Sequence, residues 1–380
     1  MEPVWWAPQA EEASRSPSPG ALVALSVASG LVGAAVLTVV LLAGGAFDNN
    51  APAPVVGAPN NVVEIREIVT EGTPTPASSI AKKVVPSIVT VEVGTSGNAV
   101  EFDAVASGSG VVLTDDGFII TNHHVIEDTS RARVTFQDGR VYAADVVGSD
   151  PLTDLAVLAI DANGLVPIQI GTSSDLSIGD PAIAVGNPLG LRGGASLTVG
   201  VVSAFDREVF VGSDRLFGML QTDAPITQGS SGGALVDDKG ELIGITSAIG
   251  VSSAGAEGIG FAIPVELVTR ITNEIIATGD VRHAFLGVTL FDELEEQADG
   301  ARVPVGTNIT SFVGNPSAAL GAGLQVGDRI VRFDDTVVRT LDDVIIGVRQ
   351  YRVGDVVEVE VERNGERLTT LISLGDRGDL

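Results

Sequence analysis

The segment 222–235 carries the residues best suited to chemistry, because Ser231 stands there among glycines in the run TDAPITQGSSGGAL. Glycine adopts positive φ without a Cβ clash, so a turn at this point can aim successive backbone N–H groups at one spot. The N–H groups of Gly229 and Ser231 would then bind the negative oxygen that develops during acyl transfer, with Ser231 as the nucleophile. A surface loop rich in Gly and Ser has the same composition, so the proposed chemistry depends on partner residues elsewhere.

A serine nucleophile needs a base, and histidine suits this role because its pKa lies near the operating pH. The chain has three histidines, of which His123 and His124 precede the serine and His283 follows it. His123 and His124 lie shortly after the apolar run 118–120, which is expected to be a strand. Side chains alternate along an extended segment, so we expect only one of the two to face Ser231.

Asp154 is the candidate carboxylate, since it directly precedes the apolar run 155–160. A carboxylate at the mouth of a buried strand is costly unless it is hydrogen-bonded. His124 could supply that bond through Nδ1–H and leave Nε2 free to face the serine. Asp150 and Asp161 are competing acids, although Asp150 precedes a proline and is typical of a turn.

The order of these residues separates two classes of serine enzyme. The run 229–233 also fits the G-x-S-x-G motif of α/β-hydrolases, which place their acid and histidine after the serine. Here only His283 follows, and 234–245 is typical of a hairpin with its turn at 237–240. His, Asp, Ser is the order of the chymotrypsin-like double barrel, which makes an esterase the weaker hypothesis.

Short apolar runs separated by turn residues fill the region 78–278, and this pattern is typical of antiparallel β-structure. Asp-Asp-Gly at 115–117 and Gln-Asp-Gly-Arg at 137–140 predict two hairpins. The run 264–276 is predicted as the one clear helix, with proline at its start and Gly279 after its end. We therefore expect an antiparallel β-domain with one late helix.

The amino-acid composition excludes several classes of binding partner and cofactor. The chain has 22 basic and 49 acidic residues and a net charge of −27, so nucleic acid is not an expected partner, because phosphate contacts need clustered Lys and Arg. The absence of cysteine excludes disulfides, thiolate catalysis and Cys-based zinc sites. Three histidines leave little material for a histidine metal site, and no metal or other cofactor is expected.

The N-terminal part predicts a membrane anchor. Residues 1–20 are polar, 21–47 contain no charged residue, and 48–77 form a proline-rich linker. A span of this length exceeds the roughly 20 residues that cross a bilayer and the roughly 7–15 of a signal-peptide core. Arg15 before the span and no further basic residue until Arg66 favour a cytoplasmic N-terminus. The remainder would then lie on the extracytoplasmic side of the cell membrane.

The C-terminal region 281–380 resembles a PDZ domain of the bacterial, permuted type, in the runs FLGV at 285–288, NPSAAL at 315–320 and GLQVGDRIV at 323–331. In such a domain the backbone N–H groups of Leu286, Gly287 and Val288 would bind the carboxylate of a C-terminal peptide. The peptide itself would add a strand to the sheet edge.

The region 78–278 contains five motifs in a fixed order: TNHHV at 121–125, TDLAVL at 153–158, GNPLG at 186–190, the segment 222–233 and GIGFAIP at 258–264. Together with the PDZ motifs they resemble the HtrA/Deg family of trypsin-like serine proteases. The resemblance implies His124 as general base, Asp154 as orienting carboxylate and Ser231 as nucleophile. The sequence departs from the family pattern at His123, where alanine or asparagine is common, and at Ser230, where asparagine is usual.

The resemblance further implies a serine endopeptidase of the cell envelope that cleaves misfolded or exposed protein segments and assembles as a homotrimer. It also implies a resting state in which the oxyanion loop can be collapsed, and cleavage after aliphatic residues. Ile226 gives an apolar substrate pocket, which argues against selection of Lys or Arg. The competing hypothesis is a non-catalytic peptide-binding scaffold or chaperone.

The sequence therefore predicts a mainly β chain: a chymotrypsin-like double β-barrel at 78–278, a PDZ domain at 281–380 and one transmembrane helix at 21–47.

Overall fold

The computed structural model describes residues 75–97, 102–127, 129, 131–187, 194–211, 214–249, 258–314 and 317–379, all within the unit Thr70–Leu380. The predicted tail 1–20, the anchor 21–47 and the linker up to residue 74 lie outside these ranges. Among the helices of the described ranges, none has the length and apolar character needed to cross a bilayer.

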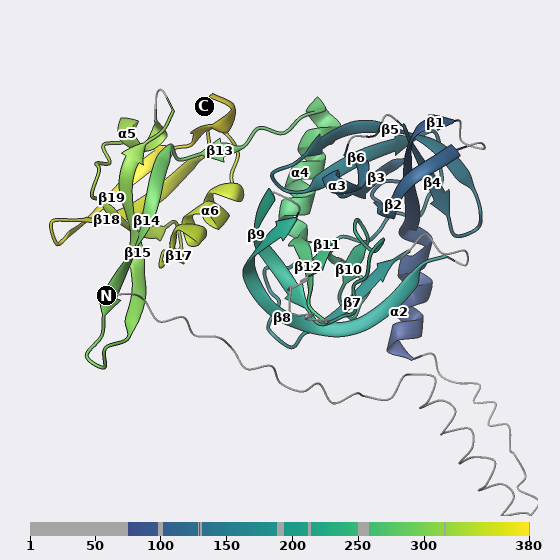
Figure 1. Cartoon of the computed structure of the whole chain (residues 1–380), viewed down its shortest axis with the longest axis horizontal. Coiled ribbons are helices and arrows are strands. Elements are labelled where there is room, and N and C mark those ends of the chain that lie inside the picture. The colour runs from purple at the N-terminus through teal and green to yellow at the C-terminus, as the bar shows by residue number, and fades with distance from the viewer. Residues whose placement is uncertain are drawn as a thin grey trace, which may run out of the picture. The chain divides into compact units, whose positions relative to one another are not determined.

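The first barrel is a closed antiparallel sheet with the strand order β1-β2-β3-β6-β5-β4 (Figure 1). Its strands are β1 (Ile88–Gly97), β2 (Phe102–Val112), β3 (Phe118–Thr121), β4 (Arg131–Phe136), β5 (Val141–Asp150) and β6 (Leu155–Ile160). In β4 every second residue is buried, as expected for a strand with one face in the core. Both predicted hairpin turns lie where expected, between β2 and β3 and between β4 and β5.

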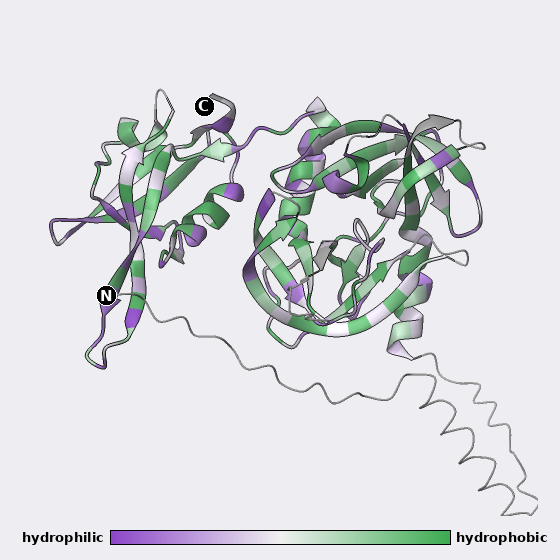
Figure 2. Ribbon diagram, in the orientation of Figure 1, coloured by the Kyte–Doolittle hydropathy of each residue, from purple (hydrophilic) through white to green (hydrophobic). Residues whose placement is uncertain are grey.

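The second barrel is also closed, with the order β10-β11-β12-β9-β8-β7. Its strands are β7 (Pro181–Gly186), β8 (Ser196–Val211), β9 (Asp214–Thr222), β10 (Ala234–Val236), β11 (Leu242–Ile249) and β12 (Gly260–Pro264). Apolar and polar stretches alternate along the barrel strands (Figure 2). The expectation of a mainly β double-barrel domain is confirmed.

Helices are more numerous in this domain than the sequence predicted. Helix α2 (Pro76–Val84) begins within the expected linker, because Thr75 caps it by accepting a hydrogen bond from the Ser78 N–H and proline occupies its first position. A short helix α3 (His123–Ile126) follows β3. The expectation that 121–125 is extended is therefore wrong for the two histidines, whose side chains diverge by about 100° around a helix.

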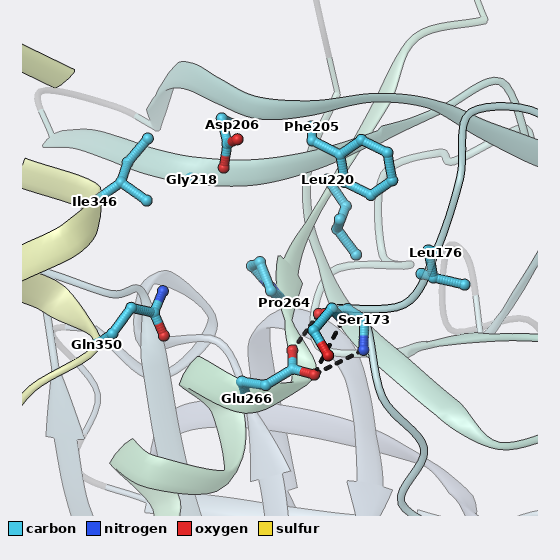
Figure 3. A pocket seen from close by; sticks show the side chains of 11 residues that line it. Ser173, Leu176, Phe205, Asp206, Gly218, Leu220, Pro264, Glu266, Ile346 and Gln350 are labelled. Atoms are coloured by element: carbon cyan, nitrogen blue, oxygen red, sulfur yellow. Dashed lines mark hydrogen bonds between the residues drawn. The ribbon is translucent and has the colours of Figure 1, made fainter. Parts of the chain in front are cut away.

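The predicted late helix is α4 (Val265–Thr278), which ends at Gly279 with φ of 80°. Near its start, Glu266 accepts hydrogen bonds from the Ser173 N–H at 2.7 Å and from the Ser173 hydroxyl (Figure 3). Burial alone would raise the pKa of Glu266, but these hydrogen bonds outweigh it and lower the pKa. The contact between Glu266 and Ser173 holds the segment before β7 against α4. Both residues line a pocket of about 370 Å³, together with Leu176 and Leu220.

The C-terminal domain is a sheet of order β14-β15-β16-β18-β19 with two helices. The strands are β14 (Val288–Glu296), β15 (Arg302–Phe312), β16 (Arg329–Phe333), β18 (Val356–Arg363) and β19 (Glu366–Ser373), with a short β17 (Thr336–Val337) paired to β16. Helices α5 (Ala318–Gly321) and α6 (Leu341–Arg349) accompany it, and β13 (Ala284–Phe285) pairs with β20 (Gly375–Asp376). Its own apolar core includes Leu286, Phe333 and Val344.

Candidate active site

His124 and Asp154 form a direct pair. The His124 Nδ1 atom lies 2.9 Å from each carboxylate oxygen of Asp154, and the His124 backbone N–H donates to Oδ1 at 3.0 Å. Asp154 is 3% exposed, whereas the His124 side chain is 30% exposed. The ring therefore has one nitrogen held by a buried carboxylate and a face that substrate can reach.

Asp154 adopts φ of 57°, which is uncommon for a residue other than glycine. Two hydrogen bonds to its carbonyl oxygen hold this backbone: one from the His123 N–H at 3.1 Å and one from the Asn122 side chain at 2.9 Å. The strained turn thus fixes the carboxylate within hydrogen-bonding distance of His124 Nδ1.

Asp150, considered above as a competing acid, instead organises the turn that leads to Asp154. Its buried carboxylate accepts hydrogen bonds from the Leu152 N–H at 3.2 Å and the Thr153 hydroxyl at 2.5 Å, and lies 2.9 Å from Nε2 of His283. Burial alone would raise its pKa, but His283 and these hydrogen bonds outweigh it and lower the pKa. This contact of His283 was not predicted from the sequence.

Ser231 is linked to this pair by hydrogen bonds through a third residue, Ser247. Its hydroxyl donates to the carbonyl oxygen of Ser247 at 3.1 Å, and the Ser247 hydroxyl donates to Asp154 Oδ2 at 2.5 Å. In the described part of the chain no hydrogen bond joins Ser231 to His124. This role of Ser247 was not predicted, because a serine near the end of an ordinary β-strand carries no distinguishing pattern.

The loop around Ser231 has the backbone that glycine permits, with φ of 89° at Gly229 and 83° at Gly232. Its hydrogen bonds run from Ser230 N–H to the Thr227 carbonyl at 2.9 Å and from Gly232 N–H to the Thr246 carbonyl at 2.8 Å. The N–H groups of Gly229 and Ser231 have no acceptor among the described residues. Two donors in the loop of the candidate nucleophile are therefore available to a substrate oxygen.

The expected substrate-pocket residue Ile226 lies in the core of the second barrel and is 8% exposed. It packs directly against Gly260 of β12, where an added Cβ would come within 2.5 Å of the Ile226 Cδ1 atom. Its role in substrate selection remains a prediction.

The predicted carboxylate-binding loop of the C-terminal domain lies between β13 and β14. Gly287 has φ of 80°, and its carbonyl accepts from the Val313 N–H at 2.9 Å and the Ser317 hydroxyl at 2.8 Å. Leu286 and Val288 line a cavity of about 500 Å³ that also includes Val344 of α6. Apolar side chains of the domain share the lining of this cavity with charged residues that include Arg215, Arg270 and Arg349. The apolar part, beside a sheet edge, suits a peptide side chain. Residues 315 and 316 of the quoted motif lie outside the described ranges.

Comparison with known proteins identifies the two domains. Residues 108–245 match the trypsin-like peptidase domain family, and residues 284–374 match the PDZ domain family. The chain is thus a trypsin-like serine endopeptidase with a PDZ domain.

Individual serine proteases are similar to this chain over most of its length. The chain is 35% identical to serine protease PepD of Mycobacterium tuberculosis, over 94% of this chain and 77% of that protein. It is 38% identical to serine endoprotease DegS of Escherichia coli K12, over 80% of this chain and 87% of that protein. It spans about half the length of the DegP-like endoproteases of Chlamydia that it also matches.

Among solved structures, the HtrA-type protease AlgW with a tripeptide superposes with a TM-score of 0.65 at 34% identity, over 79% of this chain and 97% of that one. The chain belongs to the HtrA family of serine proteases.

Proposed function

We propose that this HtrA-type endopeptidase hydrolyses peptide bonds with a triad of His124, Asp154 and Ser231. The observation that supports it most is the pair of short contacts between His124 Nδ1 and the buried Asp154 carboxylate. The pair fixes the ring so that Nε2 is left to accept a proton. Ser231 is joined to the same carboxylate through Ser247.

The reaction would begin when the Ser231 side chain turns about χ1 from the Ser247 carbonyl towards Nε2 of His124. His124 then accepts the hydroxyl proton as Oγ attacks the substrate carbonyl, and the N–H groups of Gly229 and Ser231 bind the resulting oxyanion. His124 protonates the leaving amine, which leaves an acyl-enzyme, and water attacks this ester with His124 again as base. Asp154 holds the ring through Nδ1 and stabilises the imidazolium each time it forms.

We further propose that the substrates are misfolded or exposed protein segments of the cell envelope, met on the extracytoplasmic side of a membrane anchored by 21–47. A C-terminal peptide bound beside Leu286, Gly287 and Val288 would regulate cleavage, and Ile226 would favour aliphatic residues at the cut. The AlgW complex with a tripeptide supports a role for bound peptides in this class of protein. A homotrimer is the proposed assembly.

The test uses the full-length chain with unfolded casein and a fluorophosphonate probe, with and without C-terminal peptides. Wild type is expected to cleave casein and to label at residue 231, while Ser231→Ala does neither and keeps its melting temperature. Casein cleavage by Ser231→Ala at the wild-type rate would refute the triad. A wild-type chain that binds casein without cutting or labelling would instead be a scaffold or chaperone.

The membrane proposal needs a separate test. Fractionation of cells should recover the chain with the membrane, and a deletion of 21–47 should release it. Recovery of the full-length chain in the soluble fraction would refute the anchor.

A further inference from the structure

Ser109 lies on β2 of the first barrel and belongs neither to the triad nor to the five sequence motifs quoted above. It is fully buried, with 0% exposure, and all of its polar groups are hydrogen-bonded. A buried polar residue with every bond satisfied is strongly oriented, because each lost bond would leave a partner unpaired.

Two of the four hydrogen-bond partners of Ser109 belong to the loop of the nucleophile. Its backbone N–H donates to the Ser231 carbonyl at 2.7 Å, and its hydroxyl donates to the Gly229 carbonyl at 2.8 Å. The same hydroxyl oxygen accepts from the Asn187 N–H at 2.8 Å. The Ser109 carbonyl accepts from the hydroxyl of Thr121 on β3 at 2.8 Å.

Through these bonds, a residue of the first barrel holds two consecutive turns of a loop that belongs to the second barrel. The carbonyls of Gly229 and Ser231 lie in the peptide planes that follow each residue. These two planes flank the peptide that carries the Ser231 N–H, and the first of them adjoins the peptide that carries the Gly229 N–H, so anchoring both carbonyls restricts the direction of both N–H groups. Gly229 has φ of 89° and, as a glycine, has many other conformations open to it. An external anchor is therefore what keeps its peptide plane in one orientation.

The packing around Ser109 leaves no room for it to shift. A Cβ at Gly232 would come within 2.2 Å of the Ser109 carbonyl oxygen, and a Cβ at Gly186 within 2.9 Å of its hydroxyl oxygen. Both neighbours are glycines, so backbone from the second barrel closes directly onto Ser109.

We propose that Ser109 is a positioning residue for the oxyanion loop: its hydroxyl, shared between the Gly229 carbonyl and the Asn187 N–H, sets the direction of the two N–H groups that bind the oxyanion. The inference rests on the proposed function, because it requires that the N–H groups of Gly229 and Ser231 act in acyl transfer. Ser109 itself does not touch the substrate.

The test compares Ser109→Ala with Thr121→Val in the full-length chain. Thr121 is equally buried and its hydroxyl bonds to the same residue, but it makes no hydrogen bond to residue 229 or 231. Removing one oxyanion donor costs about 100- to 1,000-fold in kcat, so misdirecting the loop should cost Ser109→Ala about 10- to 100-fold. KM should stay within about threefold, and Thr121→Val should keep kcat near wild type at a comparable loss of melting temperature.

A second measurement separates positioning from general destabilisation. A peptide boronic acid depends on the oxyanion donors once it bonds to Ser231, whereas a noncovalent product peptide does not. Ser109→Ala should bind the boronate about 10- to 100-fold more weakly and the product peptide with unchanged affinity. Ser109→Cys, which keeps the volume and a weak S–H donor, should fall between wild type and alanine, and it replaces Ser109→Ala if that variant does not fold.

Two outcomes would overturn the inference while leaving the proposed function in place: kcat of the Ser109 variants equal to that of Thr121→Val, or equal losses for boronate and product peptide. A wild-type chain that neither cleaves casein nor labels at Ser231 would overturn the proposed function itself, and the inference with it.

Discussion

Replacing Ser247 with alanine should slow catalysis although Ser231, His124 and Asp154 all remain. The Ser247 hydroxyl is one of three donors to the Asp154 carboxylate, beside the ring and the backbone N–H of His124. Asp154 is only 3% exposed, so solvent has little access to replace the lost donor. A hydrogen bond to a charged group contributes about 1.5–3 kcal/mol, and about 1.4 kcal/mol corresponds to a tenfold change in rate.

The loss should fall mainly on kcat, since the carboxylate is needed most when His124 carries a proton in the transition state. We therefore expect kcat of Ser247→Ala to be about 10- to 100-fold below wild type, with KM nearly unchanged. The Ser247 carbonyl, which accepts the Ser231 hydroxyl, is backbone and survives the substitution.

The assay is steady-state cleavage of a fluorogenic peptide by the full-length chain, with the melting temperature measured in parallel. Ser203→Ala is the control, because Ser203 lies half-buried on β8 and its hydroxyl has no hydrogen-bond partner among the described residues. Activity of Ser247→Ala within twofold of the Ser203→Ala variant would refute the reasoning.

Two further predictions concern stability. Gly232→Ala should unfold the protease domain or destabilise it by about 3 kcal/mol or more, because the new Cβ would lie 2.2 Å from the Ser109 carbonyl oxygen in a residue with φ of 83°; a denaturation midpoint equal to wild type would contradict this. The pKa of Asp150 is lowered in the folded protein, so folding favours its ionised form. The contribution of Asp150 to the free energy of unfolding is therefore complete above its pKa in the unfolded chain, about 3.9. This contribution is lost as the pH falls through the lower pKa of the folded state. The difference in unfolding free energy between wild type and Asp150→Asn should therefore be largest above about pH 5 and shrink towards pH 2, and an Asp150→Asn variant whose deficit grows on acidification would show that the sign is wrong.

Much of the architecture could be predicted from local patterns. The hairpin at 115–117 was predicted from the glycine at its third position and from the apolar runs on both sides. The bounds of α4 were predicted from Pro264 before its start and Gly279 after its end. These patterns work because turn and cap geometry depends on a few adjacent residues. Where local preference was weak the prediction was wrong, as for His123 and His124, which lie in a helix of four residues rather than in an extended segment.

The sequence alone determined which residues have the chemistry for acyl transfer, since one glycine-framed serine, two upstream histidines and an acid before a buried strand leave few combinations. Only the tertiary structure decided how those residues are held. Ser247 meets Asp154 across 93 positions of sequence and Ser109 meets Gly229 across 120. A serine hydroxyl has no periodicity and many ordinary uses, so such bonds cannot be inferred until the two closed barrels bring distant strands within hydrogen-bonding distance.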